Sequence, residues 1–299
     1  MPPSALVREE VDIRTVDGEL LRATVVSPGQ RSPRVVVVLA HAMFARRSEF
    51  EKPTPEEGWL TTLALHGARA IAFDFRGHGD SGKSASSGGF WSYDDLVTRD
   101  LPAVVAAATA RSEGAKVIVV GHSLGGHAAL AACGAGHMRV DGLVLIAANV
   151  WMPHHERSLA RRVAKRAVME SLRLSTARVG YFPARTLRQG SDDEAAPFIH
   201  DLVRFYESDR WTSGDGRVDF EASLATIAAP LLAVASQGDR IECHPESARA
   251  FLSNFGGKSE MFIVSEGDGG GAAPSHMGLV TSPSARQVRD TVVRWILER

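Results

Sequence analysis

A serine stands between two glycines in "VIVVGHSLGGHAAL", where a run of β-branched residues ends and an alanine-rich stretch begins. The run predicts a buried strand and the stretch predicts a helix, so Ser123 would lie in the turn between them. Gly121 and Gly125 permit a sharp turn with close backbone approach, which leaves the serine hydroxyl exposed above the sheet. The helix that follows directs N–H groups and a partial positive charge toward an anion forming there. This pattern is typical of a nucleophilic serine.

The rest of the chain predicts the sheet that must hold this turn. Continuous apolar runs, typical of strands buried on both faces of a parallel sheet, occupy residues 34–40, 68–75, 115–120, 140–148, 229–236 and 259–265. Helical patterns occupy 56–66, 93–111, 124–135, 244–255 and 284–298. Asp17-Gly18 between two alternating segments predicts an N-terminal hairpin. We expect an open, mostly parallel sheet with helices on both faces and ligands bound at the carboxyl ends of its strands.

One stretch breaks the alternation of strands and helices. From Trp151 to about Ala222 the sequence offers two or three amphipathic helices joined by Pro and Gly, which predicts an insertion lying over the sheet as a lid. The predicted organisation is a core of residues 1–149 and 223–299 with a helical lid at 150–222. The first lid helix has a basic face opposite an Ala and Val stripe. We expect that basic face to be solvated, with an anionic substrate or a lipid surface as the second interpretation. Its members are Arg157, Arg161, Arg162, Lys165 and Arg166.

The order of elements and the serine turn resemble the α/β-hydrolase superfamily, especially lid-bearing bacterial hydrolases of the lipase, esterase and thioesterase kind. The resemblance extends over nearly the whole chain. It implies the α/β-hydrolase fold, with a mostly parallel eight-stranded sheet and an inserted helical lid. It also implies a serine hydrolase in which the nucleophile, the acid and the histidine follow one another in that chain order.

Asp239 is the candidate for the acid. It lies in "QGDRIECHPE", at the carboxyl end of the buried run 229–236, where the family pattern expects an acid. The alternative is an aspartate that only caps the following helix or closes a turn. Asp268 is a rival, but it follows the last strand and lies too near the candidate histidine to match the pattern.

His276 is the candidate for the base among 11 histidines. It follows the final buried run and lies in "SHMGLV", which resembles the His loop of the family, in a loop expected to return toward Ser123. Most of the others fall on helix ends, in the predicted lid or beside the nucleophile, and His127 lies inside the helix that follows Ser123. The alternative for His276 is an exposed side chain without a role. The Gly-rich stretch before it implies mobility, so we expect a long or absent hydrogen bond between Ser123 and His276 in the empty site.

The oxyanion hole should combine two backbone N–H groups. One is that of Leu124, directly after the nucleophile, and the second is that of Met43 in "LAHAMFARRSEF". Ala42 stands where such families usually have Gly, which is sufficient if the backbone there stays in a region open to side chains. Arg46 and Arg47 either line the entrance, where they would meet a substrate carboxylate, or lie on the surface.

Two further patterns of the sequence do not fit a cofactor or a metal site. Gly77-x-Gly79-x-x-Gly82 follows a strand, but it continues into a Ser and Gly loop, whereas a dinucleotide fingerprint opens a helix. His154 and His155 are adjacent and would point in different directions on a helix. No cofactor and no metal are therefore expected.

Composition describes an ordinary globular chain. It has 299 residues, of which 44% are hydrophobic and 23% charged, with a formal net charge of -1. This balance gives no basis for nucleic-acid binding, and neither a signal peptide nor a transmembrane segment is predicted. The two cysteines fit reduced thiols, so a cytoplasmic location is expected. The expected partner is a small acyl substrate, with a homodimer left open.

These features predict hydrolysis of a carboxylic ester through an acyl-enzyme, with Ser123, His276 and Asp239 as a triad. A thioesterase, an acyltransferase, an amidase or a carbon–carbon bond hydrolase would use the same triad. A non-enzymatic ligand receptor on the same scaffold is the third class, because a fold alone does not determine a function. The natural substrate and its acyl chain length are left open by the sequence.

Overall fold

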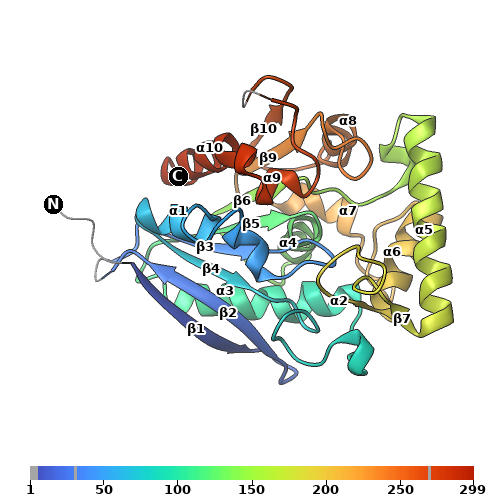
Figure 1. Cartoon of the computed structure of the whole chain (residues 1–299), viewed down its shortest axis with the longest axis horizontal. Coiled ribbons are helices and arrows are strands. Elements are labelled where there is room, and N and C mark those ends of the chain that lie inside the picture. Colours follow the sequence, from blue (N-terminus) through green and yellow to red (C-terminus); the bar gives the residue numbers. More distant parts are fainter. Residues whose placement is uncertain (1–5, 30–31, 269–270) are drawn as a thin grey trace.

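The centre of the molecule is an eight-stranded sheet with the order β1-β2-β4-β3-β5-β6-β9-β10 (Figure 1). The computed structural model describes residues 6–29, 32–268 and 271–299. Antiparallel pairing joins β1 to β2 and β2 to β4, and the other neighbours are parallel. The predicted mostly parallel sheet and its N-terminal hairpin are thereby confirmed. The strands are β1 (Val7–Arg14), β2 (Leu20–Ser27), β3 (Val35–Ala40), β4 (Ala68–Phe73), β5 (Lys116–His122), β6 (Gly142–Ile146), β9 (Leu231–Ser236) and β10 (Ser259–Val264).

Helices cover both faces of this sheet. The helices of the core are α1 (Trp59–Leu65), α2 (Tyr93–Asp95), α3 (Leu101–Ala110), α4 (Leu124–Gly134), α8 (Pro245–Phe251), α9 (Gly278–Thr281) and α10 (Arg286–Leu297). Every helix predicted for the core is present, although most are shorter than their sequence pattern. The predicted helix 93–111 is a continuous helical run in which a π-helical turn, Leu96–Asp100, separates α2 from α3.

Two apolar cores lie on opposite faces of the sheet because successive strand side chains point to opposite sides. In β3, Val36 and Val38 belong to the core under α3 and α4, whereas Val35 and Val37 belong to the core under α1 and α10. This double burial explains why the strands are continuous apolar runs.

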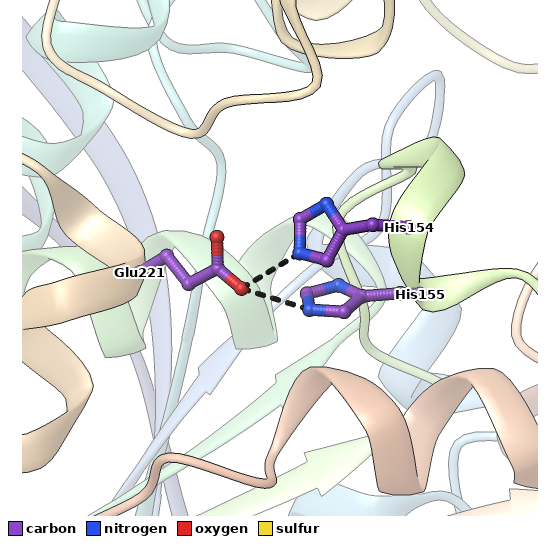
Figure 2. A group of neighbouring side chains, drawn as sticks. All are labelled: His154, His155 and Glu221. Carbon is purple, nitrogen blue, oxygen red and sulfur yellow. Dashed lines mark hydrogen bonds and ion pairs between the residues drawn. The ribbon is translucent and has the colours of Figure 1, made fainter.

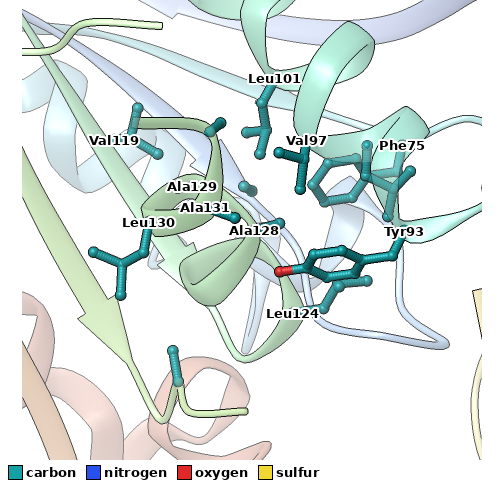
Figure 3. Close-up of a cluster of buried hydrophobic side chains, with 14 of the residues drawn as sticks. Phe75, Tyr93, Val97, Leu101, Val119, Leu124, Ala128, Ala129, Leu130 and Ala131 are labelled. Carbon is teal, nitrogen blue, oxygen red and sulfur yellow. The ribbon is translucent and has the colours of Figure 1, made fainter. Parts of the chain in front are cut away.

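Helix α4 contacts the sheet through small side chains. Figure 3 shows Ala128, Ala129 and Ala131 of this helix among Val119 and Leu101, in the first of the two cores. These residues are fully buried. An alanine-rich helix can pack closely on a sheet, so the residue at its N-terminus is held at the sheet edge.

Between β6 and β9 the chain leaves the sheet and forms a separate group of elements. These are α5 (Leu159–Val179), β7 (Tyr181–Phe182), β8 (Glu194–Ala195), α6 (Ala196–Ser208) and α7 (Phe220–Ser223). Helices α5 and α6 pack against each other at one end of the molecule (Figure 1). The two short strands pair with each other and not with the main sheet.

The orientation predicted for the first of these helices is wrong in one respect. Lys165 belongs to the basic face predicted to be solvated, but its side chain is buried and its Nζ donates to Glu156 Oε2 at 3.0 Å. The inward stripe of α5 is formed by Lys165, Met169 and Leu172, while Val163 is 62% exposed. Lysines are buried in proteins when their charge is paired, and sequence periodicity does not register such a partner.

Two general expectations concern the environment of the chain. In the described residues, no helix has the length and apolar character that crossing a bilayer requires. Cys133 and Cys243 are both free thiols.

Two leucines of α1 give a matched test of this architecture. Leu63 is 1% exposed and packs in the core under α1 and α10, whereas Leu65 is 60% exposed. We expect Leu63→Ala to lower the free energy of unfolding by about 2–5 kcal/mol. Leu65→Ala should change it by about 0.5 kcal/mol or less. Urea denaturation monitored by circular dichroism measures both, and equal losses would contradict the placement of α1.

Candidate active site

Ser123 occupies a strained turn between β5 and α4. Its backbone has φ 50° and ψ −113°, a region that side chains rarely adopt, and its N–H donates to Ile146 O at 2.9 Å. A Cβ on Gly121 would lie 2.3 Å from Gly126 N, and one on Gly125 would lie 2.1 Å from Ala40 O. The glycines are therefore needed for close approach, as the sequence predicted for this turn.

His276 and Asp239 are brought together by the loops after β10 and β9. His276 Nδ1 lies 2.6 Å from Asp239 Oδ2, and Asp239 Oδ1 accepts the N–H of Cys243 at 3.0 Å. Asp239 is 1% exposed. Burial alone would raise the pKa of Asp239, but its hydrogen bond to His276 and the charge of that ring outweigh burial and lower it. The carboxylate is thus kept ionised beside the imidazole.

The loop that carries His276 is held by the last residue of β9 and by the turn that follows this strand. Ser236 Oγ donates to Pro274 O at 2.6 Å, and a Cβ on Gly238 would lie 2.1 Å from Ala273 O. Residues 269–270 of the Gly-rich stretch lie outside the described residues. The contacts at Ala273 and Pro274 anchor the chain two residues before the imidazole, so a long loop still delivers His276 to a defined place.

Ser123 and His276 line one cavity of about 470 Å³. Both residues are described, and the hydrogen bonds of the His276 ring include the one to Asp239 and none to the Ser123 hydroxyl. Catalytic hydrogen bonds are often long in an empty site and tighten when a substrate binds.

The two backbone N–H groups predicted as oxyanion donors belong to residues that line the same cavity. The neighbouring amides of Ala42 and Phe44 donate to Glu49 Oε1 and Glu194 Oε1, each at 3.1 Å. Met43 lies between them and lines the cavity with Leu124. The left-handed residue of this loop is Phe44, with φ 65°, whereas Ala42 lies outside that region. An alanine at position 42 is therefore compatible with this backbone.

Apolar side chains from α5, α6 and β7 line part of this cavity. Three of the aromatic residues of the insertion, Phe182, Phe198 and Phe205, line it. Trp211 is instead fully buried against Phe220, outside the cavity. The remaining apolar contributions from the insertion come from Val150, Trp151, Val168, Met169, Leu172 and Leu202.

Arg46 and Arg47 form structural ion pairs. Arg46 Nε and Nη2 donate to the two carboxylate oxygens of Asp192 at 2.8 Å. Arg47 pairs with buried Asp74 and with Asp80. These contacts connect the loop after β3 to the insertion and to the turn after β4, which accounts for both guanidinium groups without a substrate.

A buried His–Glu pair strengthens the same connection. His78 and Glu194 are both fully buried, with His78 Nε2 3.0 Å from Glu194 Oε1, the oxygen that also accepts the N–H of Phe44. Burial lowers the pKa of His78, but the charge of Glu194 and the hydrogen bond to it outweigh burial and raise the pKa to about 9. His78 is in the turn of Gly77, Gly79 and Gly82, which all have positive φ. That turn leads into a short 3-10 turn, as expected for a tight loop.

Sequence reasoning missed several polar residues of the cavity, among them His127, Asn149 and Glu242. His127, interpreted as a helix residue without a role, lines the cavity, and its Nδ1 lies 2.9 Å from Tyr93 Oη. Burial lowers the pKa of His127 to about 3, so the ring is neutral at pH 7. Glu242 lines the cavity beside Asp239, and burial followed by the Asp239 charge raises its pKa. The position of Glu242 three residues after the candidate acid was the available signal.

Two clusters of side chains in the described part of the chain have ligand atoms close enough to share a cation. One is Asp239, Glu242 and His276, which is the His–Asp pair with its acidic neighbour. The other is His154, His155 and Glu221, away from the Ser123 cavity. The prediction that the side chains of His154 and His155 point in different directions is wrong, because both rings lie beside Glu221.

Comparison with known sequences decides the family. The family described as serine aminopeptidase, S33 matches residues 31–267. The chain belongs to this serine hydrolase family. It is an α/β-hydrolase over most of its length, in agreement with the resemblance of its motifs. No curated protein matches its sequence significantly.

Solved structures similar to this hydrolase include several esterases. An esterase from Exiguobacterium antarcticum has a TM-score of 0.63 at 18% identity, over 96% of this chain and 99% of that one. The Pyrococcus furiosus esterase Pf2001 has a TM-score of 0.64 at 18% sequence identity, over 98% of this chain and 91% of that one. Est1E from Butyrivibrio proteoclasticus, solved with ferulic acid, has a TM-score of 0.66 at 16% sequence identity, over 96% of this chain and 98% of that one. At sequence identities this low, the similarity to these structures shows only that the fold is shared.

The His78–Glu194 pair predicts a pH-dependent stability. Because the pKa of His78 is raised to about 9 in the folded hydrolase, from an ordinary value near 6.5, its stabilisation is fully present below pH 6.5 and is lost as pH rises through 9. The difference in free energy of unfolding between wild type and His78→Gln should therefore shrink from pH 6.5 to pH 9.5. Urea denaturation across this range tests it. The exposed His66→Gln serves as control, and a difference for His78→Gln that stays constant with pH would contradict the paired imidazolium.

Proposed function

We propose that this hydrolase cleaves carboxylic esters through an acyl-enzyme formed on Ser123. The observation that carries the proposal is a strained serine that shares an apolar cavity with an imidazole bonded to a buried carboxylate. A left-handed serine backbone is costly, and such strain is found where function requires it.

His276 is the proposed general base. With its Nδ1–H donated to Asp239, the second ring nitrogen, Nε2, is left to accept the Ser123 proton as the oxygen attacks the substrate carbonyl carbon. The same proton then passes to the departing alcohol. Water, deprotonated by His276, next attacks the acyl-enzyme; the acid leaves as the bond to Ser123 Oγ breaks, and His276 returns the proton to that oxygen. Asp239 holds the tautomer and stabilises the imidazolium in both steps.

The N–H groups of Met43 and Leu124 are the proposed oxyanion donors. Charge develops on the carbonyl oxygen in the tetrahedral intermediates, and donors that are already oriented stabilise it without reorganisation. The hydrogen bonds of Ala42 and Phe44 to buried or nearly buried carboxylates support this assignment, because they hold the loop on either side of Met43.

Residues 150–222 are the proposed lid, on a core of residues 1–149 and 223–299. Its apolar side chains face the cavity from α5, α6 and β7, which favours an uncharged acyl or aromatic group there. Two polar residues of the wall, His127 and Asn149, would orient the substrate, since Asn149 Nδ2 is buried without a hydrogen-bond partner in the described structure.

Amide hydrolysis at the amino end of a peptide is the second candidate. It is favoured by the description of the matching family and by Glu242, a carboxyl group in the cavity that could meet an amino group. The ester is preferred because an alkoxide is an easier leaving group than an amine, and the rest of the cavity offers little to a charged peptide. A thioester remains the closest variant of the first proposal.

Replacement of the nucleophile tests the proposal directly. Ser123→Ala should lower kcat/KM for p-nitrophenyl butyrate by about 10⁴-fold or more and abolish labelling by a fluorophosphonate probe, with an unchanged circular dichroism spectrum. Ser253→Ala, an exposed serine outside the site, is the control and should match wild type. Turnover by Ser123→Ala within tenfold of wild type would overturn the assignment. The second candidate would be favoured if the wild-type protein is labelled by the probe and hydrolyses no ester, but releases the amino-terminal residue of peptides.

The inner face of α5 should set the acyl chain length. Met169 is buried and lines the cavity, so Met169→Trp would occupy acyl space and lower kcat/KM for p-nitrophenyl octanoate about tenfold more than for the acetate. Val163→Trp, on the exposed face of the same helix, is the matched control and should leave the ratio of the two substrates unchanged. If Met169→Trp leaves the ratio of kcat/KM for the octanoate and the acetate unchanged, the acyl group does not bind beside Met169.

A further inference from the structure

Three side chains outside the Ser123 cavity converge on one point (Figure 2). His154 Nε2 lies 3.0 Å and His155 Nε2 lies 2.8 Å from the same oxygen, Glu221 Oε1. The centroids of the two imidazole rings are 4.0 Å apart. One ligand atom from each residue lies within 4.8 Å of the other two.

A short turn brings the adjacent histidines to the same carboxylate. They lie in the 3-10 turn Pro153–His155, which is flanked by extended residues, Met152 and Glu156. A single tight turn between extended segments lets both rings lie on one side, which the longer α-helix assumed from sequence would not.

Asp209 orients one of the two rings. Its Oδ1 lies 2.7 Å from His154 Nδ1 and also accepts the backbone N–H of His154 at 3.1 Å. With the Nδ1 proton donated to Asp209, a neutral His154 would present the lone pair of Nε2 to the Glu221 oxygen. Two acceptors 3.0 Å apart repel each other unless a proton or a metal ion lies between them. A carboxylate on the far nitrogen is also the usual partner of a metal-bound histidine.

We propose that His154, His155 and Glu221 form a transition-metal site that suits Zn²⁺. Two imidazoles and a carboxylate are a common zinc ligand set, whereas Ca²⁺ and Mg²⁺ prefer oxygen ligands alone. Zinc–ligand bonds of about 2.0–2.1 Å in a tetrahedron place ligand atoms about 3.3 Å apart, so the observed 2.8 and 3.0 Å need only a small opening. The side chain of His154 is 41% exposed, which leaves the fourth position to water.

The position of the site indicates a structural role. The turn at Pro153–His155 follows the exit of the chain from β6, Asp209 ends α6, and Glu221 lies in α7 just before the chain returns to the core. An ion here joins the first and last parts of the insertion. Helix α7 packs against α4, the helix that begins beside Ser123, so the ion would brace the insertion against the core. It takes no part in the ester reaction proposed above, and its test needs no substrate.

Metal titration of the whole protein, after removal of metals by a chelator, tests the site. Calorimetry with ZnCl₂ at pH 7.5 should give one ion per chain with a Kd of about 10 µM or tighter. Cobalt(II) should give the visible absorption bands of a four-coordinate ion, which tests the intact wild type without any variant. A saturating Zn²⁺ concentration of about 100 Kd should raise Tm by about 5 °C.

Variants assign the ligands. His154→Ala and Glu221→Gln should each weaken Zn²⁺ binding by 100-fold or more, and Asp209→Asn by about 10- to 100-fold, because it removes only the orienting partner. His137→Ala, an exposed histidine of the core, is the control and should bind as wild type. Circular dichroism verifies that each variant is folded.

Three results would overturn the proposal. The first is a wild-type protein that binds neither Zn²⁺ nor Co²⁺ below about 100 µM, which would make the cluster an ion pair stabilised by protons. The second is binding that folded His154→Ala and Glu221→Gln retain. The third is binding lost in His276→Ala but not in these variants, which would place the ion at the Asp239–Glu242–His276 cluster.

Discussion

The close approach of α4 to the end of β3 is the contact on which the site depends. The N–H of Gly125 donates to His41 O at 3.1 Å, and no Cβ could be placed on Gly125 without reaching Ala40 O. His41 in turn accepts the N–H of Phe75 through Nε2 at 3.0 Å. One crossing thus joins two strand ends to the first turn of the helix, and it places the Ser123 turn and the loop of Met43 side by side.

The strain at Ser123 follows from this crossing. The residue is pulled into the left-handed region because the chain must turn from β5 into α4 within the space that the flanking glycines leave. Its N–H is satisfied by Ile146 O on the neighbouring strand, so the turn loses no backbone hydrogen bond. The packing of the surrounding core, including the alanines along α4, holds Ser123 in this conformation and offsets the free-energy cost of its backbone strain.

Buried charges, as well as apolar contacts, attach the insertion to the core. Glu194 bonds to His78 and to the N–H of Phe44, while Arg46 pairs with Asp192. The energy of a buried ion pair depends strongly on the positions of its two charges. These pairs therefore favour one placement of the insertion over other placements that would bury a similar apolar area. Because Phe44 belongs to the loop after β3, the same bonds position both the part of the insertion that lines the cavity and the backbone beside Met43.

The sequence was most informative where the physics is local. Continuous β-branched runs showed the buried strands, since both faces of a parallel strand are covered, and Asp17-Gly18 showed the hairpin because few residues tolerate that turn. Gly121 and Gly125 around Ser123 indicated a tight turn for the same reason. Element ends were less well predicted, because tertiary packing decides where a helical pattern stops.

By itself, the sequence determined the kind of fold, the serine turn and the candidates for its partners, because these depend on short-range backbone preferences and on the order of elements. Tertiary structure alone decided that Lys165 is buried, that Arg46 is tied to the insertion, that His127 faces the cavity and that His154 and His155 share a carboxylate. Each of these depends on a partner or a cavity formed by residues distant in the chain. Burial, charge pairing and ligand geometry act through space, so they exist only once the distant segments have packed together.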